Sequence, residues 1–365
     1  MNRRFFLKTS GAAAALAALP ELGRAQSNGF DPRPGAWRRY EITTRVEILK
    51  PAGVSRAWVP LPAVESDYQK LLGSSWSGNG TMREELDSRY GAAMVCAEWR
   101  AGEAAPLLEV RSRIATRDRA TDFSAFDPAR RLDAASARLY TAPTEFIPTD
   151  GIVRATAKRA AGNASTELGK ARALYEWVVE NSVREPKTRG CGLGDIRVML
   201  ETGDLKGKCA DINALYVGLA RAVGLPARDV YGVRVAKSAF GYRSLGAGSD
   251  NITRAQHCRA EVFITGLGWV PVDPADVRKV VLEEKALPTT LADPIVPPVR
   301  RALFGAWETN WLAYNTAHDV KLPGSSGAPV AFLMYPQAET AAGRLDSLDP
   351  DGFRYRITAR ELKGA

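Results

Sequence analysis

The chain contains few cysteines and histidines, and it lacks a hydrophobic run long enough to cross a bilayer. Four cysteines among 365 residues are too few for a scaffold built on disulfides, and there are only two histidines. The apolar stretch from Gly11 to Leu19 is about half the length of a transmembrane helix. Because no basic stripe is interleaved with aromatic residues, we expect no nucleic-acid partner. The absences favour a soluble chain without a membrane span.

The first residues have the pattern of an export signal. Residues 2–8 read NRRFFLK, the apolar stretch follows, and residues 23–25 (GRA) are suited to cleavage. This pattern predicts a twin-arginine signal peptide over residues 1–25, with the twin-arginine export machinery as a partner. We therefore expect the mature protein to be periplasmic or secreted.

Charge gives weaker information. The whole chain carries a formal net charge of +9, but basic and acidic residues alternate along it. The balance allows a mild attraction to an anionic cell-envelope polymer.

Residues 30–138 alternate between apolar and polar positions in several short runs. Tyr40, Ile42 and Val46 are in step within the run 39–49, which is typical of a half-buried strand. Similar runs follow at 55–61, 92–99 and 107–116. Glycine and serine between Gly73 and Gly80 predict a turn between strands. The segment is predicted to be an antiparallel β domain resembling a sandwich.

Residues 141–287 change to helical spacing and then return to strands. Asp150 is placed to cap a helix that runs through Ala161, and further helices are expected from 165, at 195–200 and from 209. The runs 228–235, 259–265 and 269–272 are predicted to be strands. Helices followed by antiparallel strands indicate an α+β core.

Residues 288–365 form a C-terminal tail that follows the predicted core. Its start, 288–298, is rich in proline and is interpreted as a wrapping segment. Two strands are predicted in it, at 330–335 and 353–359. The tail is expected to be a β extension, either a separate domain or part of the core.

The core contains a thiol, an imidazole and a carboxylate in the order needed for nucleophilic catalysis. Cys209 begins an apolar helix after a glycine turn, His257 follows 48 residues later, and Asp273 follows His257 by 16 residues. A thiol at the first turn of a helix is acidified by the helix dipole and by a neighbouring imidazole, which the carboxylate orients. Each residue alone is more often structural, but all three at element boundaries favour catalysis.

The motifs around these residues resemble the transglutaminase-like superfamily of papain-related cysteine enzymes. The resemblance covers about residues 165–276 and depends on GKCAD at 207–211, LARAVGLPAR at 219–228, AEV at 260–262 and GWVPVDP at 268–274. It implies a papain- or transglutaminase-like core, with the helix that carries Cys209 packed on an antiparallel sheet. It also implies that Cys209 is the nucleophile, that His257 is first the base and then the acid, and that Asp273 orients His257.

Two positions depart from this family pattern. Arg259 stands where the family commonly has tryptophan, so it either binds an acidic substrate or pairs with Glu261 or solvent. No glutamine or tryptophan lies between Arg184 and Lys208 to complete an oxyanion hole.

Other residues near the predicted cleft have weaker assignments. Cys191 and Cys258 are expected at the same edge of the cleft, where a disulfide is possible. Tyr231 and Tyr242 are predicted to bind substrate together with Arg259. A zinc site is not expected, because adjacent strand residues 257 and 258 point to opposite faces, and no cofactor is expected.

Three further expectations are structural. Cys96 is expected to be a buried apolar residue. His318 is expected to have a structural or cleft-lining role. Asp211, Asn213 and Arg228 are expected to support the helix of Cys209.

The sequence therefore predicts an exported cysteine enzyme that acts on amide bonds through a thioester. Hydrolysis by a protease or amidase is favoured, because water is abundant and transamidation needs a cleft that excludes it. The alternatives are a cross-linking protein-glutamine transamidase and a catalytically silent binding or assembly module of the envelope. The expected partner is a peptide or protein substrate.

Overall fold

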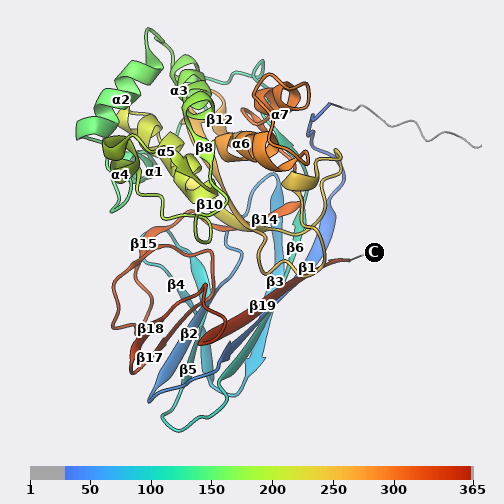
Figure 1. The fold of residues 1–365 in the computed structure, drawn as a ribbon, viewed down its shortest axis with the longest axis vertical. Coiled ribbons are helices and arrows are strands. Elements are labelled where there is room, and N and C mark those ends of the chain that lie inside the picture. Colours follow the sequence, from blue (N-terminus) through green and yellow to red (C-terminus); the bar gives the residue numbers. More distant parts are fainter. Residues whose placement is uncertain (1–28, 363–365) are drawn as a thin grey trace, which may run out of the picture.

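The computed structural model describes residues 29–362. The predicted signal peptide, residues 1–25, lies outside the described residues. Within the described residues, no helix is both long and apolar enough to span a bilayer. The chain forms a β-sandwich and a helix-rich core that lie one above the other (Figure 1).

The sandwich consists of two antiparallel sheets that face each other. The strands of the first sheet, in spatial order, are β19 (Phe353–Leu362), β1 (Arg38–Ile48), β6 (Leu107–Thr116) and β3 (Gln69–Gly78). The strands of the second are β18 (Gly343–Leu345), β17 (Gln337–Thr340), β2 (Ser55–Pro60), β5 (Ala93–Trp99) and β4 (Thr81–Leu86). Val46, Val95 and Trp99 are among the apolar residues buried between them. The alternation predicted for β1 is confirmed, since Tyr40, Ile42 and Val46 are buried.

The turn predicted at Gly73–Gly80 is wrong, because most of this segment belongs to strand β3. Nearly all of β3 is exposed, so it shows no apolar alternation that would reveal a strand. It pairs with β6 through a register shift between Leu71 and Ser74. Gly73 has φ 103° there, a conformation that favours glycine.

The C-terminal strands complete this sandwich instead of forming a unit of their own. β19 pairs antiparallel with β1 from Arg39↔Leu362 to Ile48↔Phe353. β17 pairs with β2 in the other sheet. Figure 1 shows the red C-terminal strand beside the blue N-terminal one. The sandwich is therefore built from both ends of the chain.

The core is an antiparallel sheet covered by helices. Its strands, in spatial order, are β12 (Gly268–Val272), β11 (Gln256–Ile264), β10 (Ala227–Arg234) and β14 (Trp311–Asn315). The helices are α1 (Ala134–Thr141), α2 (Gly151–Ala161), α3 (Glu167–Asn181), α4 (Ile196–Thr202), α5 (Cys209–Ala222), α6 (Pro274–Glu283) and α7 (Val296–Ala302). A short 3₁₀ turn spans Arg243–Leu245.

Helix α5 is the centre of the core. Every residue from Cys209 to Arg221 is buried, because the sheet covers one side of the helix and α2, α3, α4 and α6 cover the others. Its end agrees with the sequence, since Gly224 follows the helix with φ 85°.

The proline-rich segment contributes to this core. α7 begins within it and has proline in its first turn, where the missing N–H is not needed. β14, farther along the tail, forms an edge of the core sheet. The predicted boundary at residue 288 therefore separates no structural unit.

Short two-residue and three-residue strands connect these parts. They pair as β7 (Arg119–Ala120) with β13 (Ala306–Trp307), β8 (Val183–Arg184) with β9 (Lys206–Gly207), and β15 (His318–Val320) with β16 (Val330–Phe332). A further apolar cluster joins the sandwich sheet to the core sheet, with Ile42 and Ile357 packing near Leu312. This cluster fixes the two layers against each other.

Candidate active site

Cys209 is the first residue of α5, and its position is set by a buried aspartate in the first turn of the helix. Asp211 accepts hydrogen bonds from the backbone N–H groups of Lys208 (2.9 Å), Leu193 (3.0 Å) and Gly194 (2.9 Å). The aspartate thus ties the preceding loop to the start of the helix. This agrees with the supporting role expected for Asp211.

A glycine immediately before the helix is required for this arrangement. A Cβ added at Gly207 would lie 2.5 Å from the Asp211 side chain. The glycine turn therefore allows the carboxylate to reach back under the N-terminus of α5.

His257 and Asp273 meet on one face of the core sheet. The register of β11 with β12 pairs Ala260 with Val272, so residues 257, 259 and 273 point to the same side. Nε2 of His257 lies 2.8 Å from Oδ2 of Asp273. This pairing was predicted, and the sequence had left its register open. It needs no bulge between the two strands.

Asp273 also begins the next helix. It is the N-cap of α6, and its Oδ1 accepts from the N–H of Asp276 at 3.0 Å. Asn213, one turn beyond Cys209 on α5, donates to the same oxygen at 3.3 Å and to the carbonyl of Cys258 at 2.8 Å. Asn213 thus connects the cysteine helix to the strand and helix that hold the other two residues.

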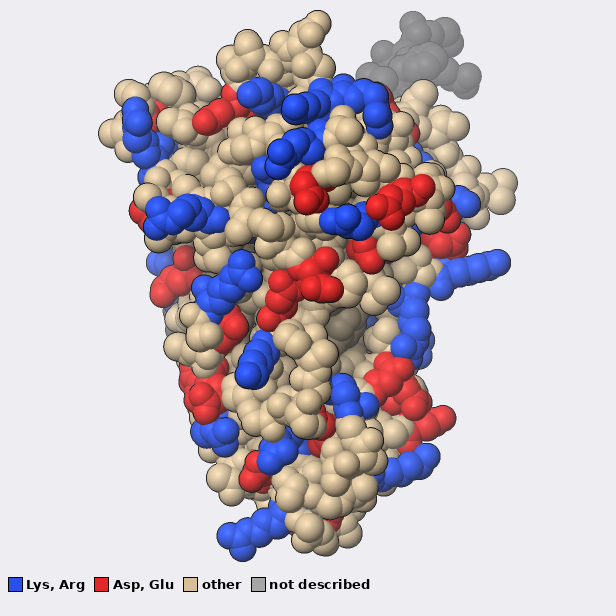
Figure 2. All heavy atoms as spheres, turned by 90° about the vertical axis from the view of Figure 1, so that its left-hand side faces the viewer, with Lys and Arg blue, Asp and Glu red and all other residues tan. Residues whose placement is uncertain are grey.

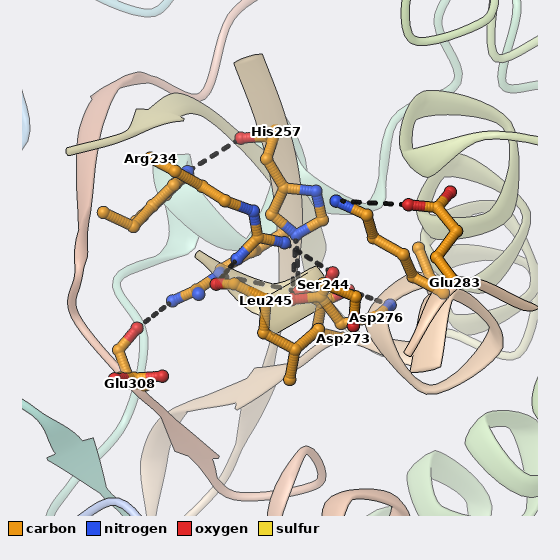
Figure 3. Close-up of polar contacts among 12 residues, drawn as sticks. Arg234, Ser244, Leu245, His257, Asp273, Asp276, Glu283 and Glu308 are labelled. Carbon is orange, nitrogen blue, oxygen red and sulfur yellow. Dashed lines mark hydrogen bonds and ion pairs between the residues drawn. The ribbon is translucent and has the colours of Figure 1, made fainter. Parts of the chain in front are cut away.

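A second carboxylate, Asp276, faces the same imidazole. Its Oδ2 lies 3.4 Å from His257 Nε2, and its Oδ1 accepts from Arg234 at 2.6 Å. Figure 3 shows the ring nitrogen of His257 directed at both carboxylates, with Arg234 beside them. The sequence analysis missed Asp276. Its signal was an aspartate three residues after Asp273, which places it in the first turn of the helix that Asp273 begins.

The surroundings of His257 favour its charged form. Burial opposes ionisation, but Coulombic attraction to Asp276 and Asp273 and the hydrogen bond with Asp273 raise the pKa of His257 to about 9. Burial also raises the pKa of Asp273, whereas Arg234 and then His257 hold the pKa of Asp276 well below its usual value against the effect of burial. Asp276 is thus the more firmly ionised of the two carboxylates.

The surroundings of Cys209 favour the thiolate. Hydrogen bonds from Cys191 and Cys258 are the largest causes that hold the pKa of Cys209 well below its usual value. Burial works against them, and His257 adds a hydrogen bond and a Coulombic attraction. Because Nε2 of His257 faces the carboxylates, Nδ1 is the ring nitrogen left for the sulfur.

The suggested disulfide between Cys191 and Cys258 is wrong, since all four cysteines of the chain are free. Interaction with Cys209 contributes to raising the pKa of both thiols well above the usual value, and the Cys191 thiol also lies 3.5 Å from the Gln256 carbonyl oxygen. Cys191 lines the cleft, as expected, whereas Cys258 is fully buried and does not line it. Cys96 is a buried residue of the sandwich, and burial raises its pKa to about 12.

The structure places the predicted substrate-binding residue Arg259 behind the site. It lies two residues beyond His257 on β11, so it shares the face on which Asp273 lies. Its Nη1 donates to the Glu308 carbonyl at 2.9 Å, and its Nε is 3.5 Å from Asp273 Oδ2. The guanidinium also lies over the Trp311 ring, 4.8 Å from its centroid. Arg259 is fully buried and stabilises Asp273, so a role in binding substrate in the cleft is contradicted.

Glu261 was the other partner considered for Arg259, and it is occupied elsewhere. It pairs with Arg228 at 2.6 Å and also with Arg119. The Arg228 guanidinium lies over the Trp269 ring at 4.0 Å from its centroid. Arg228 was expected to support the helix of Cys209, but these contacts place it against the strands β11 and β12 instead.

Tyr231 and Tyr242 are also outside the cleft. The hydroxyl of Tyr231 lies 3.3 Å from Nδ1 of His318, and its ring stacks on Phe332. The hydroxyl of Tyr242 donates to the Ile295 carbonyl at 2.9 Å. Both side chains are held by the interior, so the substrate-binding role predicted for them is not supported. His318 is buried with Tyr231 and has a structural role.

Cys209 and His257 open into a cleft of about 670 Å³ between the core and the C-terminal segment. Its walls come from the loop before α5, from residues 246–257, from α6 and from residues 335–355. The lining side chains are those of Arg184, Arg189, Cys191, Lys208, Cys209, Arg234, Ala247, Asn251, Thr253, Arg254, Ala255, Gln256, His257, Lys279, Tyr335, Ser347, Leu348, Pro350, Phe353 and Tyr355. The cleft is large enough for a peptide segment.

The spacing of His257, Asp273 and Asp276 would also suit a metal ion, because one ligand atom from each lies within 4.8 Å of the others. The donor set does not fit one well, however. Arg234 and Arg259 already neutralise the two carboxylates, and the imidazole nitrogen is engaged by both. The charges favour an imidazolium at this position.

Comparison with known proteins agrees with this geometry. Residues 154–274 match the model of the transglutaminase-like superfamily. The chain is 36% identical over 369 residues to an uncharacterized protein of Haemophilus influenzae, covering 96% of this chain and 99% of that protein. The core therefore contains a domain that matches the transglutaminase-like superfamily, and the chain forms one family with the Haemophilus influenzae protein along its length.

Solved structures share the fold. A candidate cysteine protease from Cytophaga hutchinsonii superposes with a TM-score of 0.57 at 14% identity, covering 91% of this chain and 93% of that one. The periplasmic domain of TgpA from Pseudomonas aeruginosa gives a TM-score of 0.34 at 14% identity, over 66% of this chain and 89% of that one. The first likeness supports the fold, and the second is too low to carry an argument.

Proposed function

We propose that the protein is an exported cysteine hydrolase that breaks amide bonds through a thioester intermediate. The observation that carries the proposal is that Cys209 and His257 lie together at the wall of one cleft, with the buried Asp273 behind His257. A buried thiolate beside an imidazolium is the resting state of an activated cysteine nucleophile.

The acylation step uses the charges of the resting site. The thiolate of Cys209 attacks the amide carbonyl carbon, a carbon–sulfur bond forms, and the carbonyl oxygen takes the negative charge. The imidazolium of His257 gives its Nδ1 proton to the amide nitrogen, and the carbon–nitrogen bond breaks to release an amine. Asp273 and Asp276 stabilise the imidazolium throughout by holding Nε2.

Deacylation then restores the site. Neutral His257 takes a proton from water at Nδ1, and the hydroxide formed attacks the thioester carbon. The carbon–sulfur bond breaks and returns the electron pair to Cys209 as a thiolate. The products are a carboxylic acid and the starting enzyme.

Trapping of the thioester tests this proposal. The purified protein is mixed briefly with a peptide library, quenched in acid, and measured as intact protein by mass spectrometry. We expect an acyl adduct on Cys209 that is absent from Cys209→Ala and disappears in water. If the adduct is lost only after an amine such as glycine methyl ester is added, the result would favour transamidation. If no peptide gives an adduct, the result would contradict the proposal.

Export rests on residues 1–25 alone. Replacement of Arg3 and Arg4 by lysine should keep the protein in the cytoplasm, because the twin arginines are the recognised pair. Fractionation of cells that carry the wild-type and the doubly substituted chain measures this. Equal export of both chains would contradict a twin-arginine signal.

A further inference from the structure

Among the described residues, the cleft around Cys209 is lined by cations and by no carboxylate. Six basic side chains contribute to its walls: Arg184, Arg189, Lys208, Arg234, Arg254 and Lys279. By contrast, the cleft of about 540 Å³ beside Arg119 and Arg228 has both signs of charge on its walls, including Asp67 and Glu261. Elsewhere on the surface the two signs are interspersed, as one face of the molecule shows (Figure 2). The single sign at the active cleft is therefore a local feature.

The cations of this cleft outnumber the carboxylates that pair with them. Arg189 pairs with Asp346 at 2.5 Å and Arg234 with Asp276 at 2.6 Å. Arg184 and Lys279 share one carboxylate, that of Glu283. Three carboxylates thus serve four of the six cations.

The other two cations of the cleft, Lys208 and Arg254, form no ion pair with a carboxylate of the described residues. Lys208 directly precedes Cys209, and Arg254 lies three residues before His257. Both line the same cleft as the sulfur and the imidazole. Unneutralised charge therefore lies next to the reacting groups, on both the cysteine side and the histidine side.

The excess of positive charge in the cleft affects the side chain of Lys279. Its side chain is largely buried, and Glu283 Oε2 lies 3.8 Å away. Burial, together with Coulombic repulsion by Arg234, lowers the pKa of Lys279 to about 8. A bound anion would offset the repulsion by Arg234 and raise the pKa of Lys279 again, because an opposite charge favours the ammonium form.

We propose that the substrate is a peptide that carries carboxylate groups next to the amide bond that Cys209 attacks. This inference rests on the proposed function for the amide bond and on the cleft for the carboxylates. Lys208 and Arg254 bind these carboxylates and select acidic peptides over neutral ones. The ammonium of Lys208 acts as a point charge, and the guanidinium of Arg254 can hold a carboxylate with two parallel hydrogen bonds.

The test compares matched peptides that differ only in charge. One peptide has glutamate on both sides of the scissile amide, a second has glutamine there, and each is made with a free and with an amidated C-terminus. Binding is measured by fluorescence anisotropy on Cys209→Ala, and turnover on the wild-type protein. The glutamate arm reports side-chain carboxylates, and the C-terminal arm reports terminal ones.

We expect the carboxylate-bearing peptides to bind at least tenfold more tightly than the neutral peptide at low salt. This preference should shrink at about 0.5 M salt, where charges are screened within a few ångströms. Lys208→Gln or Arg254→Gln should each reduce the preference about fivefold, the upper end of what an exposed ion pair contributes. Lys50→Gln and Arg100→Gln remove exposed cations of the sandwich and should leave it unchanged.

The outcomes separate this inference from the proposed function. Equal binding of the acidic and neutral peptides, at low and high salt, would overturn the inference even if both are cleaved. Selective binding of the acidic peptide without an acyl adduct on Cys209 would instead contradict the hydrolase and leave the inference intact. If the two cations serve only to support the thiolate, their removal will slow Cys209 alkylation and leave the peptide preference unchanged, which also overturns the inference.

Discussion

Asp276 places its carboxylate 3.4 Å from Nε2 of His257, the nitrogen that Asp273 already contacts at 2.8 Å. The imidazole thus faces two carboxylates on one side and a thiolate on the other. Arg234 and Arg259 balance the carboxylates from behind. In the resting site, the proton shared by Cys209 and His257 therefore lies on His257.

Asp276→Asn should lower the pKa of His257 from about 9, because attraction to Asp276 is the largest cause that raises it. An NMR titration of the imidazole measures this directly. The only other histidine, His318, has its pKa held well below the usual value by burial, so its signal will not overlap. An unchanged titration of His257 would contradict a role for Asp276.

The same substitution should also cost stability. Arg234 would remain buried without its partner, which typically destabilises a protein by about 3–5 kcal/mol. Urea unfolding at neutral pH measures this loss separately. The NMR titration still reports on the folded fraction, so the two effects can be distinguished.

Activity should depend on pH in the form of a bell. As pH rises through about 9, His257 loses the proton that the leaving amine needs, so kcat/KM should fall. As pH falls through the lowered pKa of Cys209, the thiolate becomes protonated and the rate falls again. A profile of kcat/KM against pH on an acyl-transfer substrate measures both limbs. A rate that keeps rising above pH 9 would show that His257 is not the acid.

Cys191→Ala should make Cys209 less reactive. The hydrogen bond from Cys191 is the largest cause that lowers the pKa of Cys209, and a hydrogen bond to a charged group contributes about 1.5–3 kcal/mol. We expect alkylation of Cys209 near pH 6 to slow by about tenfold. Cys96→Ala removes a buried thiol of the sandwich and serves as the control. Equal rates in the two variants would contradict the donor role of Cys191.

Gly232→Ala should disturb His257 through its backbone. Gly232 lies opposite His257 on the neighbouring strand, and an added Cβ would lie 2.0 Å from the Leu312 carbonyl. The Trp311 ring, whose Nε1 donates to the His257 carbonyl at 2.8 Å, would also have to move. We expect a loss of about 1–3 kcal/mol in unfolding free energy together with lower kcat.

Gly35→Ala is the matched control for this substitution. A Cβ at Gly35 meets its nearest atom at 3.8 Å, an ordinary contact. Thermal unfolding and kcat of the two variants should therefore diverge. Equal stability of the two would contradict the close packing at Gly232.

The sequence predicted the strands and helices that have one buried and one exposed face, because their apolar residues recur at a regular spacing. β1 has water on one face and the core on the other, so its alternation can be read from the sequence. Asp150 occupies the N-cap position of α2 as expected, but its side chain makes no capping hydrogen bond. β3 is exposed almost throughout, so its pattern was indistinguishable from a turn. β19 was found as a strand, but its pairing with β1 depends on tertiary contacts more than 300 residues apart along the chain.

The residues of the candidate site likewise fall into those that the sequence predicted and those that it did not. Cys209, His257 and Asp273 stand at element boundaries with a family-like spacing, so the sequence identified them. Arg259 was misassigned, because its charge suggested an exposed residue and only the structure shows that Asp273 and Trp311 enclose it. No local pattern could show that Cys191 and Cys258 converge on a third sulfur.

Alkylation of Cys209 by iodoacetamide at about pH 6 tests the central claim most directly. Mass spectrometry of the wild-type protein and of His257→Ala gives the rate at each cysteine. The account predicts fast labelling confined to Cys209, and labelling at least tenfold slower in His257→Ala. A wild-type rate no faster than that of a free cysteine at the same pH would contradict it.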